Sequence, residues 1–230
     1  MSNYVLAMHI VELIAALAGS YYSLKVKDKT LAVFVWYLWV TVFVETFGMY
    51  GYILQNDYDY EWFVWIKNSV FRSNNWLYNL YRVVSIILFG QFYERVIKDP
   101  SVTKLIRILV IAYVCFTVVY FTMSGTFFIF SLPYGVFVET FLVFVFVMFY
   151  YRQLLKSDKI LYFYKLPVFY ISSGLLLWYL SVTPIFIFNS YLNVINDKFL
   201  EFRDFYLFIA NISLYLCYTF CFLFTLRRKK

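Results

Sequence analysis

The chain consists of long apolar runs separated by short polar clusters. Seven runs are each about 20 residues long, the length of helix that crosses the hydrocarbon core of a bilayer. They cover approximately residues 4–24, 31–54, 76–97, 105–123, 130–151, 165–189 and 204–226. The boundary between the fourth and fifth runs is the weakest, because Ser124-Gly125 is its only turn signal. The pattern predicts an all-α integral membrane protein, with residues 1–230 forming one bundle of seven transmembrane helices joined by short loops.

Residues 55–75 separate the second and third runs and are too polar to cross a membrane. Trp62, Phe63, Trp65 and Ile66 stand among charged residues there. This mixture is typical of a segment that lies in the membrane interface. Two alternatives stay open: the aromatic side chains anchor the segment at the headgroups, or Trp62 and Trp65 form a lid over the bundle. We expect an interfacial segment on the outer membrane face.

The composition supports a membrane protein. Hydrophobic residues make up 63% of the chain and charged residues 14%, whereas soluble domains average about 45–50% and about 25%. The mean hydropathy is +0.72. The first run could also be a cleavable signal peptide ending at Ala16-Leu17-Ala18, but it has no basic start and Glu12 interrupts it. We therefore keep residues 4–24 as the first span.

The basic residues give the predicted bundle an orientation. Of the 20 Lys and Arg residues, 15 fall on the side that also holds the C-terminus. They are Lys25, Lys27, Lys29, Arg95, Lys98, Lys104, Arg107, Arg152, Lys156, Lys159, Lys165 and Arg227 to Lys230. The other side holds Lys67, Arg72, Lys198 and Arg203. The positive-inside rule then predicts an external N-terminus and a cytoplasmic C-terminus, in a plasma or inner membrane.

The net charge of +7 is explained by this distribution. Basic residues at one membrane face contact anionic lipid. We therefore expect the lipid bilayer as a partner and expect no nucleic-acid partner.

Four ionisable residues interrupt the apolar runs. The hexapeptide Val-Phe-Val-Glu-Thr-Phe occurs at 42–47 and again at 136–141, which places Glu45 and Glu139 inside spans. Glu12 and Arg82 interrupt two other runs. A charged group at membrane depth costs about 2.5–3.5 kcal/mol on insertion scales and is a functional-site hypothesis by default. An inverted repeat would put Glu45 and Glu139 at mirrored depths, and counting puts them at the same depth, so we treat the repeat as a local similarity.

These groups fall at one level of the predicted bundle. Glu45, Arg82 and Glu139 lie about six to ten residues from the outer ends of their spans, or roughly 9–15 Å deep at 1.5 Å per residue. Glu12 and Asn211 fall at a similar level, and Asn79 shares a helix face with Arg82. The sequence predicts one polar cavity in the outer half of the bundle. Its candidate ligand- or ion-binding residues are Glu139, Glu45, Glu12, Arg82, Asn79 and Asn211.

The charges in this cavity cannot all be paired. One glutamate can form a charge-assisted pair with Arg82, and burial favours the neutral form of the others. The group is then either an interhelical Arg–Glu pair with protonated acids that holds helices together, or a site for a ligand, ion or proton. Three acids exceed what one pair requires, which favours the binding site.

No cofactor or metal is predicted. His9 precedes Glu12 by one turn, but it is the single histidine, and Cys115, Cys217 and Cys221 lie at other levels. Motifs of P-loop proteins, serine hydrolases and zinc proteases are absent from the sequence, so we do not expect an enzyme. Residues 204–226 contain no lysine for a retinal Schiff base.

The expected function is that of a small transporter or channel that moves a small solute, cation or proton past the acidic cluster. Two alternatives are kept. The first is a ligand-sensing membrane module that signals through a membrane or cytoplasmic protein partner. The second is a structural subunit of a membrane complex.

Overall fold

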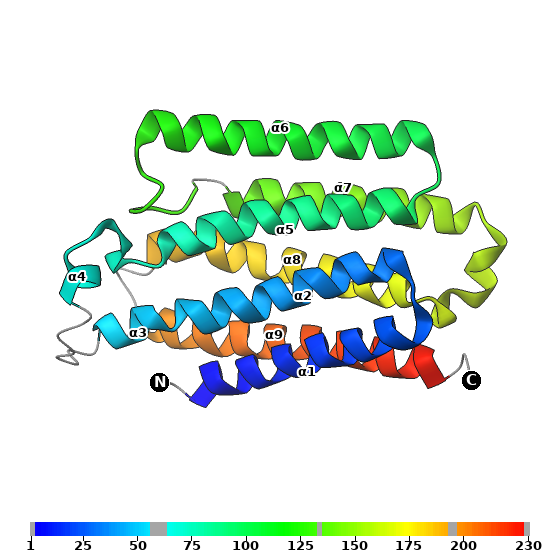
Figure 1. Ribbon diagram of the computed structural model, residues 1–230, viewed down its shortest axis with the longest axis horizontal. Helices are drawn as coiled ribbons and strands as arrows, with labels where there is room; N and C mark the ends of the chain where they lie inside the picture. The colour runs from blue at the N-terminus through cyan, green and yellow to red at the C-terminus, as the bar shows by residue number, and fades with distance from the viewer. Residues whose placement is uncertain (1–2, 56–63, 133–134, 193–196, 228–230) are drawn as a thin grey trace.

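A computed structural model of the chain describes residues 3–55, 64–132, 135–192 and 197–227 (Figure 1). Every regular element in these ranges is a helix. The long helices are α1 (Asn3–Val26), α2 (Lys29–Gly48), α5 (Asn75–Val96), α6 (Pro100–Ser124), α7 (Gly135–Leu155), α8 (Pro167–Leu192) and α9 (Asp197–Arg227). The short ones are α3 (Tyr50–Gln55), α4 (Val64–Lys67), η2 (Val70–Arg72) and η3 (Asp158–Lys165).

Six of the long helices are long and apolar enough to cross a membrane, namely α1, α2, α6, α7, α8 and α9. The chain is therefore a helical, multi-pass membrane protein. α5 has 22 residues but is more polar, because it carries Asn79, Arg82, Glu94 and Arg95. It packs against α2, α6 and α7, and a helix covered by protein can carry polar groups at little cost.

The ends of the helices follow from local signals. The Asp28 carboxylate accepts from the Thr30 and Leu31 amides at the start of α2, which satisfies two backbone donors that the helix leaves unpaired. Asp99 caps α6 in the same way, ahead of Pro100. The predicted boundary at Ser124-Gly125 is confirmed, since α6 ends at Ser124 and Gly125 adopts a left-handed conformation with φ of 65°, which glycine tolerates.

Three predicted boundaries differ from the structure. The span predicted at 130–151 is a helix over Gly135–Leu155. The span predicted at 31–54 is divided, because α2 ends at Gly48 and α3 begins at Tyr50. The span predicted at 204–226 extends to Asp197 at its start. Apolar residues continue across the first two boundaries, so hydropathy alone did not mark them.

Six helices form a closed ring. Each packs against two others, in the order α1, α2, α5, α7, α8, α9 and back to α1. α6 lies outside the ring across α5 and α7, at the top of Figure 1. α1 closes the ring through small residues: a Cβ atom at Gly19 would lie 3.0 Å from Val35 of α2 and 3.1 Å from Phe222 of α9.

The half of the ring nearer the C-terminus is filled by aromatic side chains. Phe34, Phe92, Phe146 and Phe222 are fully shielded from solvent. The ring of Phe34 lies 5.6 Å from that of Phe92 and 4.9 Å, edge to face, from that of Tyr218. Such contacts stabilise by about 0.5–1.5 kcal/mol per pair beyond burial. This half is a tightly packed core.

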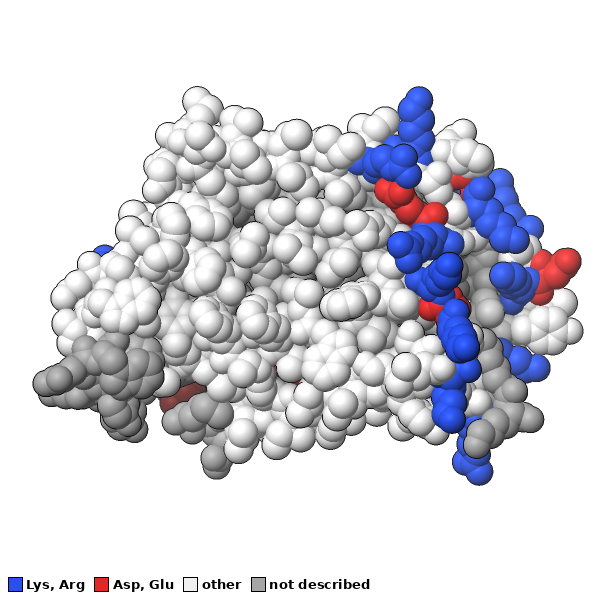
Figure 2. All heavy atoms as spheres, viewed as in Figure 1, with Lys and Arg blue, Asp and Glu red and all other residues white. Residues whose placement is uncertain are grey.

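The same end of the molecule carries the basic residues. Figure 2 shows Lys and Arg side chains gathered around the end where the C-terminus lies, while the middle of the visible face is uncharged. On this end Arg107 Nη2 pairs with Glu94 Oε2 at 2.7 Å, and Arg95 Nη1 donates to the Lys29 carbonyl at 2.8 Å. We call it the basic end.

Gly90 marks the close approach of α6 to the ring. A Cβ atom there would lie 2.5 Å from Val110 Cγ2 of α6. Alanine gains up to about 1 kcal/mol of helix propensity over glycine, and overpacking costs about 1–3 kcal/mol. We expect Gly90→Ala to lower the free energy of unfolding by about 1–2 kcal/mol, measured by denaturant unfolding in one detergent. Adding Val110→Ala should recover most of the loss, and a double variant as unstable as the single one would contradict a local clash.

Candidate functional site

A cavity of about 350 Å³ lies inside the ring, in the half away from the basic end. All six ring helices line it. Its ionisable lining residues are Glu12 of α1, Glu45 of α2, Arg82 of α5 and Glu139 of α7. The structure therefore brings together the four charged residues that the sequence placed at one level.

Arg82 and Glu139 form a buried charged contact at this cavity. Arg82 Nη1 lies 3.8 Å from Glu139 Oε1, and the Glu139 side chain is only 7% exposed. The Tyr113 hydroxyl donates to the same carboxylate oxygen at 2.9 Å. Arg82 Nη1 itself has no hydrogen-bond partner among the described residues. Glu139 thus receives one charged neighbour and one hydrogen bond, both from other helices.

Gly135 makes room for this arrangement. It is the first residue of α7, and a Cβ atom there would lie 3.0 Å from Arg82 Nη1. A larger residue at this position would require the guanidinium to shift. Because α7 begins at Gly135, Glu139 lies about one turn inside its helix, shallower than the sequence predicted.

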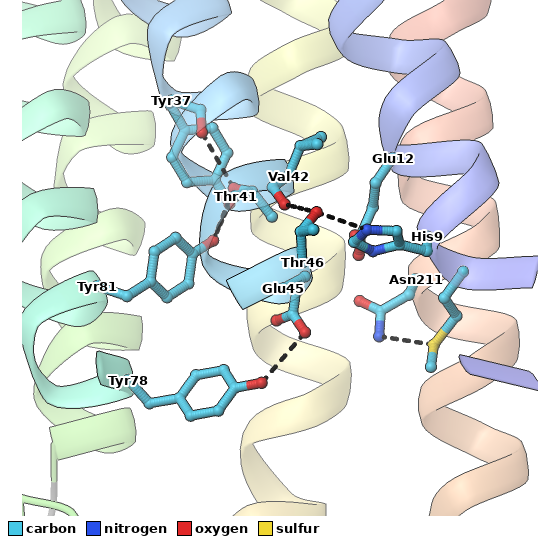
Figure 3. Close-up of polar contacts among 11 residues, drawn as sticks. His9, Glu12, Tyr37, Thr41, Val42, Glu45, Thr46, Tyr78, Tyr81 and Asn211 are labelled. Carbon is cyan, nitrogen blue, oxygen red and sulfur yellow. Dashed lines mark hydrogen bonds and ion pairs between the residues drawn. The ribbon is translucent and has the colours of Figure 1, made fainter. Parts of the chain in front are cut away.

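Glu45 has one neutral hydrogen-bond partner. The Tyr78 hydroxyl of α5 donates to Glu45 Oε2 at 3.2 Å (Figure 3). The salt bridges found among the described residues do not include Glu45.

Glu12 is paired with His9, one turn earlier on α1. His9 Nδ1 lies 3.5 Å from Glu12 Oε2, and His9 Nε2 is 2.8 Å from Thr46 Oγ1 (Figure 3). The Thr46 hydroxyl already donates its hydrogen to the Val42 carbonyl, so it must accept from His9 Nε2. A neutral His9 then turns the lone pair of Nδ1 toward the Glu12 carboxyl group. Glu12 Oε2 is buried and has no hydrogen-bond partner among the described residues, so its contact with His9 is electrostatic.

Asn211 and Asn79 have different positions. Asn211 lines the cavity, where it accepts from Trp178 Nε1 at 2.9 Å. Asn79 does not line it, because its amide nitrogen donates to the carbonyls of Phe127 and Phe130 at 2.8 and 2.9 Å. Asn79 ties the connection between α6 and α7 to α5, and it is not brought together with the cavity-lining residues. Asn79 lies about one helix turn before Arg82 and is therefore closer to the start of α5.

The sequence missed the aromatic and hydroxyl part of the lining. The Tyr81 hydroxyl bonds to Thr41 Oγ1 at 2.9 Å and to the Tyr37 hydroxyl at 3.4 Å. Other aromatic lining residues are Tyr78, Trp178, Tyr179, Phe186 and Tyr215. The spacing of Tyr78, Tyr81, Arg82 and Ser85 on one helical face was a usable signal. This signal is hard to distinguish from chance, because 25% of the residues in the chain are aromatic.

The described part of the predicted lid does not cover the cavity. Trp65 lies in α4, is 64% exposed and is not among the lining residues. Trp62 lies outside the described residues. The described residues 64–75 instead lie beside α3 and the start of α5. The Tyr50 hydroxyl of α3 donates to the Phe71 carbonyl and accepts from Trp76 Nε1 of α5, both at 3.0 Å.

Comparison with models of known protein families, with curated proteins and with solved structures found no match for this chain. Within the described residues, no group of three or more His, Cys, Asp and Glu is arranged to hold a metal ion. The chemistry of the cavity is therefore the basis for assigning a function.

Proposed function

We propose that this chain is a small membrane transporter that binds a small solute, cation or proton in the acidic cavity. The supporting observation is the arrangement of the ring: a cavity with three carboxylates and one arginine in one half, and a closed aromatic core in the other. A carrier that exposes its site to one side of the membrane at a time needs a site that binds the substrate. It also needs a barrier that closes the pathway on the other side. A continuously open channel fits this packing less well.

The proposal includes seven spans, with α5 as the third. The axis of α5 lies alongside those of its neighbours in the ring (Figure 1), and its polar residues Arg82 and Ser85 line the cavity. The basic end then faces the cytoplasm of a plasma or inner membrane. The cavity faces outward, and Asn75 and Ser131 at its rim are partly or fully exposed.

One observation favours ligand sensing as the second candidate. The half of the ring nearer the basic end is filled by buried aromatic side chains, so a ligand that binds in the cavity could change helix packing and be detected at the basic end by a partner protein. A structural subunit would need neither ligand binding nor flux. Measuring flux separates transport from both alternatives, and measuring ligand binding separates the sensing module from the structural subunit.

Flux in liposomes tests transport, and Glu45→Gln is the informative variant. Glu45 lines the cavity, and none of the salt bridges found in the described part of the chain includes it, so the variant with a neutral amide should fold normally. We expect flux of protons or a small cation to fall at least tenfold. Glu139→Gln is less suitable because it would leave Arg82 buried without its counter-charge. Asp204→Asn, an exposed acid on the same side, is the matched control, and equal flux in wild type and Glu45→Gln would contradict the role of Glu45.

Orientation is tested with a reporter at each end of the full chain. We expect a C-terminal reporter to be protected from external protease or label, and an N-terminal tag to be accessible. A C-terminal reporter that reads as external would overturn both the orientation and the outward-facing cavity.

A further inference from the structure

Glu45 differs from the other two acids that line the cavity. Glu139 lies 3.8 Å from Arg82, and Glu12 lies 3.5 Å from His9. Among the described residues no basic side chain lies within ion-pair distance of Glu45, and its hydrogen-bond partner Tyr78 is uncharged. A carboxyl group without a basic neighbour suits a ligand that carries one positive charge.

The surroundings of Glu45 suit an organic cation. The aromatic residues Tyr78, Tyr81, Trp178, Tyr179 and Tyr215 line the same cavity. Aromatic faces attract ammonium groups by about 0.5–2 kcal/mol each, more strongly when the site is desolvated, and Trp and Tyr are the preferred partners. Tyr78 is nearest to the acid, because its hydroxyl bonds to Glu45 Oε2 at 3.2 Å.

The size of the cavity also favours an organic cation. Its volume of about 350 Å³ is at the lower end of the range of about 300–1,000 Å³ for small-molecule sites. A bare inorganic ion would leave most of it unfilled, whereas an amine with a short organic body would contact both the carboxylate and the aromatic lining. Ser85 and Arg82 also line the cavity, and Ser85 Oγ and Arg82 Nη1 are buried without a hydrogen-bond partner among the described residues.

We propose that the ligand of this cavity is a small, singly charged organic ammonium compound whose cationic group sits between Glu45 and the aromatic residues, led by Tyr78. This inference rests on the proposed function, since it names the substrate class of the same site. It adds a charge, a size and a chemical type that the transport proposal leaves open.

Calorimetric titration of purified full-length protein in lipid nanodiscs tests the proposal. The probes are choline, tetramethylammonium and phenethylamine, each compared with a neutral compound of the same shape, such as dimethylbutanol for choline. We expect at least one ammonium probe to bind at least tenfold more tightly than its neutral counterpart. The zwitterion glycine betaine and sodium chloride serve as competitors that should bind more weakly.

Variants distinguish the contribution of the Glu45 carboxyl group to binding from that of the Tyr78 ring. Glu45→Gln should weaken binding of the ammonium probe at least tenfold, and Asp204→Asn should leave it unchanged. Tyr78→Phe keeps the ring and should retain most of the affinity, whereas Tyr78→Leu removes it and should lose several-fold. If Glu45→Gln fails to fold, judged by thermal unfolding without probe, the Tyr78 pair still decides.

Each outcome supports or contradicts the ligand proposal or the transport proposal. Equal affinity for charged and neutral probes, preference for betaine or sodium, or no binding by any ammonium probe would overturn the inference. Binding of an ammonium probe without its flux in liposomes would support the inference and overturn transport, in favour of sensing. Flux that no ammonium probe inhibits would support transport and overturn the inference.

Discussion

Replacing Arg82 by methionine is expected to lower the free energy of unfolding by about 3–5 kcal/mol, because it leaves Glu139 buried without its counter-charge. Methionine fills a similar volume without a charge. The Tyr113 hydrogen bond to Glu139 compensates only in part, since one neutral donor replaces a cation. Denaturant unfolding in a single detergent, monitored by tryptophan fluorescence, measures the loss.

The double variant Arg82→Met with Glu139→Gln is the control. It removes both charges, so we expect it to recover most of the stability lost by Arg82→Met. Arg95→Met at the basic end removes an arginine whose contact is exposed and should change stability by less than about 1 kcal/mol. A double variant no more stable than Arg82→Met would show that the two side chains do not depend on each other.

Replacing Phe92 by alanine should also cost about 3–5 kcal/mol, the usual loss for a truncated core aromatic residue. Phe92 is fully buried, with its ring 5.6 Å from that of Phe34 and 5.0 Å from that of Tyr93. The neighbouring rings are large and cannot collapse into the space. Thermal unfolding with and without lipid gives the change in stability.

Phe116→Ala on α6 is the matched control for Phe92→Ala. Phe116 is 54% exposed and faces away from the ring, so its truncation should change stability by no more than about 0.5 kcal/mol. Equal losses for the two variants would mean that the aromatic half is not a packed core.

The long helices could be predicted from the sequence because each one must satisfy its backbone within the membrane and therefore forms a continuous apolar run. Helix ends inside an apolar run could not be predicted in the same way. The start of α7 at Gly135 follows a proline at 133, and proline disfavours a helical conformation in the residue before it. That local effect outweighed hydropathy and moved Glu139 toward the helix end.

The charged part of the site was predictable because ionisable residues in a membrane span avoid lipid and so converge on the interior. Which glutamate pairs with Arg82 was not predictable. Arg82 had three glutamates available, and α5 packs against α2, which carries Glu45, as well as against α7, which carries Glu139. Tyr113 could not be foreseen, because it comes from the one long helix outside the ring.

The order in which the ring is assembled follows from its closure by the first and last long helices. α1 packs against α9, yet about 170 residues separate the end of α1 from the start of α9. At a synthesis rate of about 5–20 residues per second, α1 is made roughly 10–35 s before its partner. During that interval the small-residue face of α1 has no α9 to pack against, and Glu12 lacks one wall of its cavity. Biogenesis of this protein therefore depends on what shelters α1 while the chain is being completed, be it lipid, the insertion machinery or a chaperone.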